Sequence, residues 1–379
     1  MLLKIEYVET NMIYLNEVLG HFIQKSVGLK QYRKANLFPT EFLVVHDDAR
    51  NNLDKKFKVV FNQIKELDLT QKKRLRRMYV NHQRVARLCQ DNIEIIDLSS
   101  FPVELKKSLK DLGSYLYSSA LKNSRIKQLA INKHGDKNST LSDLWKAFRD
   151  QNGRVCCFCG IQEYEEQLPD DSETEWRPAF DHYLPKDQYP LAAVNFKNLV
   201  PCCTQCNSKA KGATDPCQCK ATGRKKALFP YNNSESLGLN FKFIKENIAA
   251  KSPWVVTLKN EDDEKHQTWD RVYKIKERVK SRLNAHYVNW IKVECSECLT
   301  SNIQQAKVKL GEKAVEHIEL AKEERESIHK AIMMATLATA NDDLLASLLE
   351  TIEPDPQPNN RVDGLNMLNE LGFDFCVAS

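Results

Sequence analysis

The sequence predicts a mainly α-helical protein that carries a small α+β module near its centre. Apolar residues recur at helical spacing through much of the first 140 residues and again between 303 and 350. Cysteine pairs and short extended segments gather instead between residues 156 and 211. The chain has 379 residues, of which 42% are hydrophobic, so it can build real cores and exceeds what one core usually organises. We therefore expect several domains.

Four segments follow from changes in composition along the chain. Residues 1–140 form a predicted helical N-terminal region, and residues 141–231 form the central module. Residues 232–353 form a mainly helical C-terminal region. The proline-rich stretch that starts at Pro354 is typical of an extended linker, so we assign residues 354–379 to a linker and tail.

Three helices of the N-terminal region are predicted from apolar stripes that would face a core. The stripes are Tyr14, Leu15, Val18, Leu19, Phe22 and Ile23, then Phe57, Val60, Phe61, Ile64 and Leu67, then Leu105, Leu109, Leu112 and Leu116. Residues 42–45 are either a short strand or buried chain. The sequence His46-Asp47-Asp48 has the composition of a metal pair, but no third ligand is close in sequence, so a solvated loop is the better interpretation.

Basic residues cluster between positions 71 and 87, in the run Gln-Lys-Lys-Arg-Leu-Arg-Arg-Met followed by Arg84 and Arg87. Such a block can hold phosphates without reading a base sequence. A charge run of this kind is equally the solvated face of a helix. Both interpretations stay open at this point.

Charge and cysteine content point to a reducing compartment. The 56 basic and 51 acidic residues give a net charge of +5, and the N-terminus lacks the apolar stretch of a signal peptide. No apolar run is long enough to predict a membrane span. Several of the twelve cysteines stand in Cys-x-x-Cys pairs, which favours thiolate metal ligands over disulfides. We expect a cytoplasmic protein.

Two Cys-x-x-Cys pairs predict a closed structural zinc site. Cys156 and Cys159 are followed by a glycine that permits a tight turn, and Cys203 and Cys206 repeat the spacing. Four thiolates are a typical ligand set for structural zinc. The neighbouring cysteines, Cys157 and Cys202, could each replace a ligand, and a redox or disulfide pair is the competing interpretation.

Asp181 and His182 lie between the cysteine pairs and have the chemistry for phosphodiester hydrolysis. A near-neutral imidazole can take a proton from water, and a carboxylate is a hard ligand for Mg²⁺. Neighbouring side chains of a strand point to opposite faces, so a bend or bulge would be needed to bring both into one cavity. An ordinary strand pair in a zinc ribbon that only binds is the alternative.

The order of motifs from Cys156 to Lys211 resembles the HNH endonuclease family, whose core is a ββα-metal finger. The motifs are Cys-x-x-Cys, then Asp181-His182-x-x-Pro-Lys186, then Asn198-Leu-Val-Pro, then Cys-x-x-Cys-Asn207 with Lys209 and Lys211 following. The resemblance implies that His182 is the general base and that Asn198 holds the loop between the strands. It also implies that Asp181 and Asn207 bind a catalytic Mg²⁺ or Mn²⁺ ion.

Basic residues around these motifs are the expected contacts to nucleic acid, with DNA as the expected substrate. Lys186, Lys209 and Lys211 belong to the motif region, and a second group, Arg224, Lys225 and Lys226, follows it closely. Positive charge beside a phosphate-cutting centre favours backbone binding without base reading.

The remaining cysteines carry weaker signals. Cys217 and Cys219 are separated by one residue, which is unusual for a zinc site, so we expect unligated thiols. Cys295 and Cys298 lie in a predicted helix without a second pair nearby, and we interpret them as buried thiols. Residues 241–244 and 254–258 predict a short strand pair.

Embedded HNH modules of this style are similar to those of bacterial anti-phage defence nucleases, which often act beside a separate ATPase. The resemblance therefore implies a metal-dependent endonuclease with a possible ATPase partner. The competing prediction is a non-catalytic zinc-containing protein that binds nucleic acid or serves as a scaffold.

Overall fold

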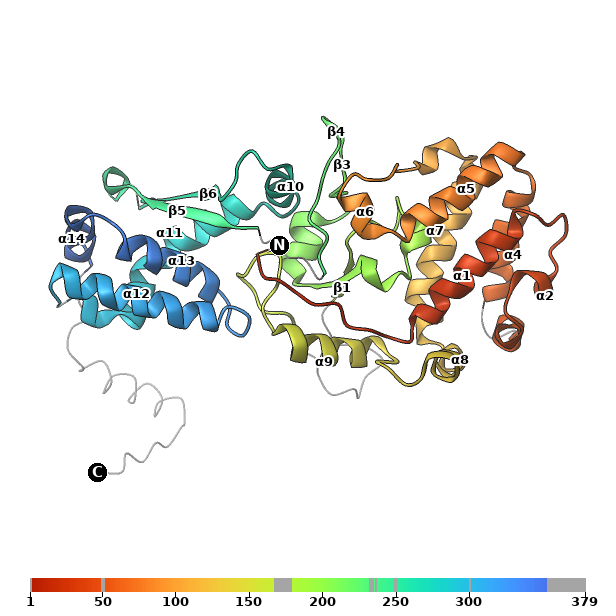
Figure 1. Ribbon diagram of the computed structural model, residues 1–379, viewed down its shortest axis with the longest axis horizontal. Helices are drawn as coiled ribbons and strands as arrows, with labels where there is room; N and C mark the ends of the chain where they lie inside the picture. The colour runs from red at the N-terminus through yellow and green to blue at the C-terminus, as the bar shows by residue number, and fades with distance from the viewer. Residues whose placement is uncertain are drawn as a thin grey trace, which may run out of the picture. The chain divides into compact units, whose positions relative to one another are not determined.

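The computed structural model describes residues 2–48, 52–166, 179–231, 235, 237–248, 251–299 and 301–352. It confirms a mainly α-helical protein with small antiparallel sheets (Figure 1). The chain divides into two compact units. The first comprises Met1–Asn240, Thr257–Arg278 and Leu320–Ile328, and the second comprises Phe241–Val256, Val279–Glu319 and His329–Ser379. The linker and tail predicted at 354–379 lie outside the described residues.

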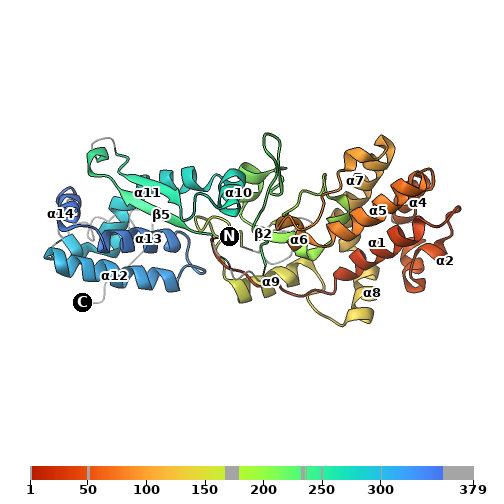
Figure 2. The same ribbon diagram turned by 45° about the horizontal axis from the view of Figure 1, so that its top comes forward.

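The N-terminal part of the first unit is built from helices. They are α1 (Ile13–Ser26), α2 (Lys34–Leu37), α3 (Leu43–His46), α4 (Leu53–Lys65), α5 (Leu69–His82), α6 (Val85–Cys89), α7 (Val103–Ser118), α8 (Ser124–His134) and α9 (Leu141–Asn152). Figures 1 and 2 both show α1, α4, α5 and α7 gathered in one helical group.

The apolar stripes predicted for α1, α4 and α7 are confirmed as core faces, because all of their residues are buried. Aromatic side chains lie at the centre of this core. The ring centroids of Phe22 and Phe57 are 4.8 Å apart, and Phe38 lies 4.9 Å from Phe57. Since each large buried side chain contributes about 1.5–3 kcal/mol on burial, this core can anchor the whole helical group.

Residues 42–45 do not form a strand. The structure has a 3₁₀ turn at Thr40–Phe42 followed by α3, so the prediction of a possible strand is wrong. Val45 faces the core while Val44 is exposed. Over only four residues, this alternation of buried and exposed side chains looks the same in a short helix and in a strand, so the sequence pattern could not decide between them.

His46 is buried, contrary to the expected solvated loop. Asp47 lies 2.6 Å from its Nδ1, and Asp54, the third ligand that sequence proximity did not reveal, lies 3.6 Å from its Nε2. The ammonium of Lys34 sits 2.8 Å from Asp47 and 3.4 Å from Asp54. A lysine bridging both carboxylates makes this group an ion-pair cluster rather than a cation site.

The central module contains two short hairpins and an unusual helix. Strand β1 (Ala179–His182) pairs antiparallel with β2 (Leu199–Cys202), and β3 (Gln218–Cys219) pairs with β4 (Gly223–Arg224). Between the hairpins, η6 (Gln205–Lys211) is a π-helix. The backbone N–H of Gly212 donates to the carbonyl of Asn207, five residues earlier, which widens this turn. Such π turns are frequent at functional sites.

The last elements complete both units. Helix α10 (Glu264–Tyr273) belongs to the first unit, and α12 (Ile303–Glu319) and α14 (Asp342–Glu350) belong to the second. The boundary between the units falls within the paired strands β5 (Leu239–Phe243) and β6 (Trp254–Leu258), and within α11 (Ile275–Glu294) and α13 (Ser327–Ala338). The strand pair expected here from the sequence is present. Within the described ranges, no helix is long and apolar enough to cross a membrane.

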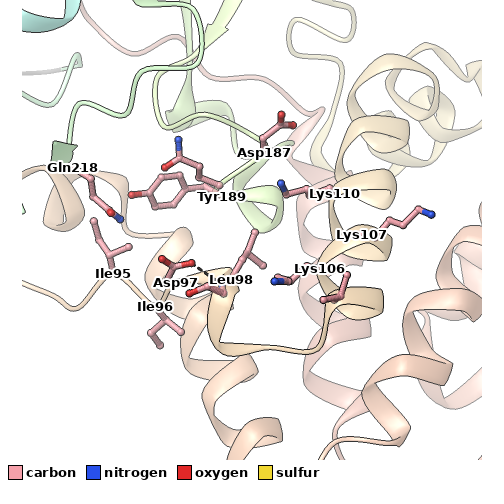
Figure 3. A pocket seen from close by; sticks show the side chains of 13 residues that line it. Ile95, Ile96, Asp97, Leu98, Lys106, Lys107, Lys110, Asp187, Tyr189 and Gln218 are labelled. Carbon is pink, nitrogen blue, oxygen red and sulfur yellow. Dashed lines mark hydrogen bonds between the residues drawn. The ribbon is translucent and has the colours of Figure 1, made fainter. Parts of the chain in front are cut away.

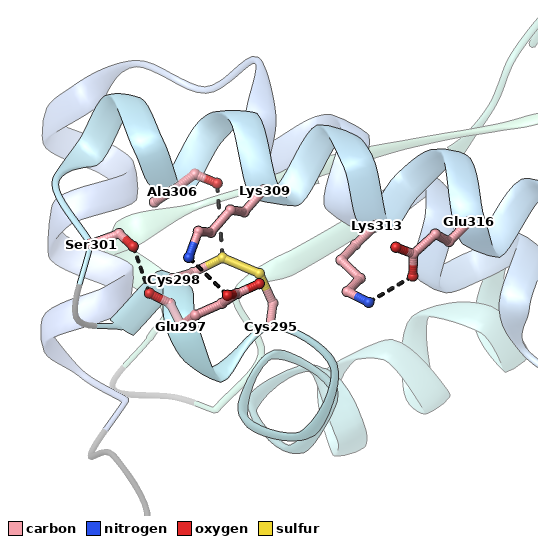
Figure 4. Close-up of a disulfide and its surroundings, with 8 residues drawn as sticks. All are labelled: Cys295, Glu297, Cys298, Ser301, Ala306, Lys309, Lys313 and Glu316. Carbon is pink, nitrogen blue, oxygen red and sulfur yellow. Dashed lines mark hydrogen bonds and ion pairs between the residues drawn. A yellow bond between two sulfur atoms is a disulfide. The ribbon is translucent and has the colours of Figure 1, made fainter.

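Cys295 and Cys298 form a disulfide in the second unit, so the prediction of buried thiols is wrong (Figure 4). The chain turns from the end of α11 into a 3₁₀ helix at Ser296–Leu299, which places the two Cα atoms 5.5 Å apart. Both side chains are buried, and the Sγ of Cys298 faces the carbonyl of Ala306 on α12 at 3.9 Å.

His82, the last residue of α5, gives the first unit a pH-dependent stability. Burial lowers its pKa to about 3, and neither ring nitrogen has a hydrogen-bond partner among the described residues. Below pH 6.5 the unfolded chain takes up a proton that the folded chain does not, so stability is complete above that pH and falls with acid. Lowering the pH from 7 to 5 should cost about 2 kcal/mol through this group.

The check is urea unfolding of the protein and of His82→Leu at both pH values. The free energy of unfolding of the variant minus that of the unsubstituted protein should be about 2 kcal/mol larger at pH 5 than at pH 7. Parallel losses in the two proteins would show that His82 does not carry the effect.

Candidate zinc site and catalytic centre

Four cysteines from the two ends of the central module meet in one buried cluster. The sulfurs of Cys156, Cys159, Cys203 and Cys206 all lie within 4.8 Å of one another. The Sγ atoms of Cys159 and Cys203, 44 residues apart in sequence, are separated by 4.0 Å. Zinc–sulfur bonds of about 2.3 Å in a tetrahedron place sulfurs about 3.8 Å apart, so the cluster fits a zinc ion held by four thiolates.

The backbone around the cluster supplies donors to sulfur. Gly160 adopts a left-handed φ of 64°, and its N–H donates to the carbonyl of Cys156 at 2.9 Å, which closes the predicted tight turn. The N–H of Ile161 donates to Cys159 Sγ at 3.4 Å. Arg278 donates through Nη1 to Cys206 Sγ at 3.2 Å. These contacts offset part of the negative charge that four thiolates would carry.

The two ambiguous neighbours, Cys157 and Cys202, stand outside the four-cysteine cluster. Burial raises the pKa of Cys157 to about 12. Burial and a hydrogen bond with Cys156 also raise the pKa of Cys202 well above its usual value. Both side chains are therefore neutral thiols at pH 7. Cys217 and Cys219 belong to no metal-ligand group among the described residues either.

Segments from both ends of the sequence brace the first cysteine pair. The N–H of Leu3 donates to the carbonyl of Cys157 at 3.2 Å. On the other side, the N–H of Arg154 donates to the carbonyl of Lys322 at 2.8 Å, and that of Glu326 donates to the carbonyl of Gly160 at 2.8 Å. The turn that carries Cys156 and Cys159 is thus held by segments that lie more than 150 residues away in sequence, one before it and one after it.

His182 is the last residue of β1 and is fixed by the loop that follows. Its Nε2 lies 2.9 Å from the carbonyl oxygen of Ala193, which can only accept, so Nε2 carries the proton and Nδ1 is the basic nitrogen. The ring packs edge-on against Tyr117 of α7, with centroids 4.5 Å apart. Burial lowers the pKa of His182 to about 4, with a further contribution from Lys186 and Lys211, against the opposing effect of the Ala193 carbonyl. The imidazole is therefore neutral at pH 7 and can accept a proton.

Asn198 spans the loop between β1 and β2. Its side-chain oxygen accepts from the N–H of Leu184 at 2.8 Å, and its Nδ2 donates to the carbonyl of Leu184 at 3.0 Å. The backbone carbonyl of Asn198 also accepts from the N–H of Tyr183 at 2.9 Å. Because the side chain is fully buried, these bonds fix the path of the chain directly after His182.

Asp181 points away from His182 because the β1–β2 register runs without a bulge. Its Oδ1 accepts from the ammonium of Lys211 at 3.0 Å, and both residues are buried. Its Oδ2 is buried without a hydrogen-bond partner among the described residues. Burial raises the pKa of Asp181, while Lys211 opposes the shift. An orphaned carboxylate oxygen is the donor that a hard cation would satisfy.

Asn207, the second residue predicted to bind a cation, lies within η6 and is half-buried. Its backbone N–H donates to the carbonyl of Cys203 at 2.9 Å, which ties it to the four-cysteine cluster. Among the described residues, no hydrogen bond joins its side chain to Asp181, whose Oδ1 is bound by Lys211. Its role as a metal ligand stays a prediction from the resemblance.

The basic residues predicted to bind nucleic acid differ in their availability. Lys209 is exposed, whereas Lys211 is buried against Asp181 and also donates to the carbonyl of His182 at 2.9 Å. Arg224 pairs with Asp91 and Lys225 with Glu264, at 2.5 and 3.2 Å. The predicted second basic group is therefore largely bound to carboxylates. The side chain of Lys211 faces inward because the π turn shifts its position on the helix.

Tyr117 and Gly113 of α7 belong to the site although sequence reasoning did not identify them. Tyr117 donates its hydroxyl to the carbonyl of Phe180 at 3.3 Å, besides packing against His182. A Cβ at Gly113 would lie 2.7 Å from the carbonyl oxygen of Pro190, so only glycine lets this loop approach α7. Both residues adjoin the predicted core stripe of α7 in sequence. No neighbouring residue in the sequence indicates that they contact the β1 strand and the loop that follows it.

Comparison with known proteins gives one partial likeness. The chain is 36% identical over 69 residues to the Septu protein PtuB of Bacillus thuringiensis. The match covers 18% of this chain and spans about a quarter, 23%, of the length of that relative. No family model matches the chain. No solved structure matches it. The residues therefore point to a buried four-cysteine site and a fixed histidine at the end of β1, in a chain that is partly similar to a Septu protein.

Proposed function

We propose that this protein is a metal-dependent endonuclease of the HNH type, which hydrolyses phosphodiester bonds of nucleic acid, with DNA as the expected substrate. The observation that carries the proposal is the fixed, neutral His182, whose Nε2 is engaged by the Ala193 carbonyl while Nδ1 keeps its lone pair. A hairpin, a buried asparagine brace and a following helix surround it in the order that the family resemblance implies.

The residues of this chain would divide the chemistry as follows. His182 takes a proton from a water molecule, and the resulting hydroxide attacks phosphorus as the bond to the leaving oxygen breaks. Asn198 and Tyr117 hold the imidazole in place during this step. The family resemblance assigns Asp181 and Asn207 to a divalent cation that would offset the negative charge on the phosphate and the leaving oxygen, although Asp181 points away from His182 in this structure.

The fit of the cation rests on Asp181. Its buried, unpartnered Oδ2 offers a hard oxygen ligand, and the partner of Oδ1 is an ammonium group. That ammonium occupies Oδ1, so a cation would bind at Oδ2 alone and would be repelled by the Lys211 charge. The zinc cluster has a separate, structural role, because four thiolates leave no open coordination position.

A role in anti-phage defence, with a separate ATPase as partner, is the wider biological proposal. The partial likeness to a Septu protein supports the defence role. The ATPase partner rests on the family resemblance alone. We place the protein in the cytoplasm, where thiolates stay available to zinc.

The test is cleavage of plasmid DNA and of labelled RNA by the zinc-loaded protein, with and without added Mg²⁺ or Mn²⁺. We expect cleavage only when one of these cations is added. Asn207→Ala should raise the Mg²⁺ concentration that gives half-maximal cleavage. Zinc content, measured in the same samples, shows that the structural site is intact throughout.

Absence of cleavage of either nucleic acid, by folded protein that retains zinc and receives both cations, would contradict the proposal. Binding without cleavage under those conditions would favour the non-catalytic zinc-containing module.

A further inference from the structure

One face of α7 joins the proposed catalytic centre to a line of lysines. Lys106, Lys110, Gly113 and Tyr117 are spaced by four, three and four residues, which places all four on one side of the helix. Tyr117 at one end packs against the ring of His182. Lys106 and Lys110 therefore lie on the same face as the contact to the histidine, about two and three turns away.

The loop after His182 runs along this face. The ammonium of Lys186 lies over the ring of Tyr117, 5.8 Å from its centroid. Pro190 contacts α7 at Gly113, and Ala193 returns to His182 through its carbonyl. The loop and the helix are thus one rigid surface rather than two independent elements.

A pocket of about 560 Å³ opens between the lysines of α7 and this loop (Figure 3). Lys106 and Lys110 stand along one side and Tyr189 of the loop stands across from them, while Asp187, also of the loop, is drawn near Lys110. Ile95, Ile96 and Leu98 provide apolar walls, and Gln218 of β3 closes one end. The combination of apolar walls with lysines along one side suits a sugar-phosphate chain, whose sugars are apolar on one face and whose phosphates are anionic.

The positive charges of Lys106 and Lys110 are not neutralised by neighbouring carboxylates of the described residues. Within the described part of the chain, no ion pair engages either ammonium, and Lys107 adds a third positive charge beside them. Two carboxylates line the pocket, but the Oδ1 of Asp97 accepts from the N–H of Ser99 at 2.6 Å. Three lysines against two aspartates leave the pocket positive.

We propose that Lys106, Lys110 and their pocket bind the backbone of the substrate strand, at a fixed distance to one side of the bond that is cut. The inference rests on the proposed nuclease function. Seven and eleven residues of α7 separate these lysines from Tyr117, a rise of about 10 and 16 Å. A strand of B-DNA advances about 3.4 Å per nucleotide, so the lysines meet phosphates about three and five nucleotides from the cut.

The first experiment measures binding of the full-length, zinc-loaded protein to fluorescein-labelled DNA by anisotropy, without added Mg²⁺, over a series of salt concentrations. Lys106→Ala/Lys110→Ala should lower the slope of log affinity against log salt by about two. The matched control is Lys55→Ala/Lys58→Ala, which removes the same charge from exposed positions on α4. The control should keep the original slope, and Lys106→Arg/Lys110→Arg should restore it.

The second experiment replaces single phosphates with neutral methylphosphonates in a substrate whose cleavage position has been mapped. Substitution about three or five nucleotides to one side of the cut should slow the unsubstituted protein and have little further effect on Lys106→Ala/Lys110→Ala. An unchanged salt slope in this variant, or an equal loss in the α4 control, would overturn the inference. If Lys106→Ala/Lys110→Ala lowered the salt slope as expected but the unsubstituted protein never cleaved DNA, the result would count against the nuclease function alone.

Discussion

Replacement of His182 by alanine is expected to lower the rate of phosphodiester cleavage by about 10² to 10⁴-fold. The reason is the loss of the imidazole that we propose accepts the proton from water, whose Nε2 is engaged by the Ala193 carbonyl while Nδ1 is available. The substitution removes a half-buried ring and leaves the hairpin bonds of β1 and β2 in place. Single-turnover cleavage of a labelled substrate at saturating Mg²⁺ measures the effect.

The matched control is His21→Ala, which removes a partly exposed histidine from α1 of the same unit. Its cleavage rate should equal that of the unsubstituted protein. Melting temperature and zinc content of His182→Ala establish that the loss is chemical and not structural. Cleavage at the original rate by a folded His182→Ala would remove the histidine from the mechanism.

Cys203→Ser is expected to lower zinc content to less than one ion per chain and to unfold the central module. Structural zinc sites contribute about 10 kcal/mol or more to folding, which is comparable to the whole stability of a domain. The effect should be large here because the ion would join Cys156 and Cys159 to Cys203, which follows β2, and to Cys206 of η6. Zinc analysis and thermal melting followed by circular dichroism measure it.

Cys202→Ser is the natural control, since Cys202 adjoins the cluster in sequence and is buried but lies outside it. It should keep its zinc and lose only the modest stability of a buried polar substitution, about 1–3 kcal/mol. If Cys202→Ser lost zinc while Cys203→Ser kept it, the ligand assignment would have to change.

Local patterns predicted much of this molecule. Helical stripes such as the one through Phe22 depend on residues a few positions apart, so periodicity alone identified the buried faces. The four-cysteine cluster was predictable for a similar reason, because each Cys-x-x-Cys turn is local and only the pairing of two turns is distant. The bracing role of Asn198 stays a prediction from the family resemblance, and the side chain makes three hydrogen bonds to the loop.

Distant partners were beyond the sequence. Nothing near Tyr117 indicates that it will meet a strand 63 residues later, and nothing near Lys34 indicates that it will bridge Asp47 and Asp54. The inward direction of Lys211 depends on one extra residue in a helical turn, which standard helical periodicity does not include. The disulfide of the second unit depends on where α11 ends, and helix ends are poorly defined by sequence pattern.

The bracing of the first cysteine pair limits how this protein can be divided. Because Leu3 and Glu326 both bond to the turn that holds Cys156 and Cys159, the shortest autonomous fragment is not the contiguous stretch that contains the motifs. Expression of residues 141–231 alone would leave backbone donors and acceptors of the zinc turn without partners. Insertions, fusions and truncations should therefore preserve the chain from its first residues through position 328. The four-cysteine site of this protein is a property of its whole first unit.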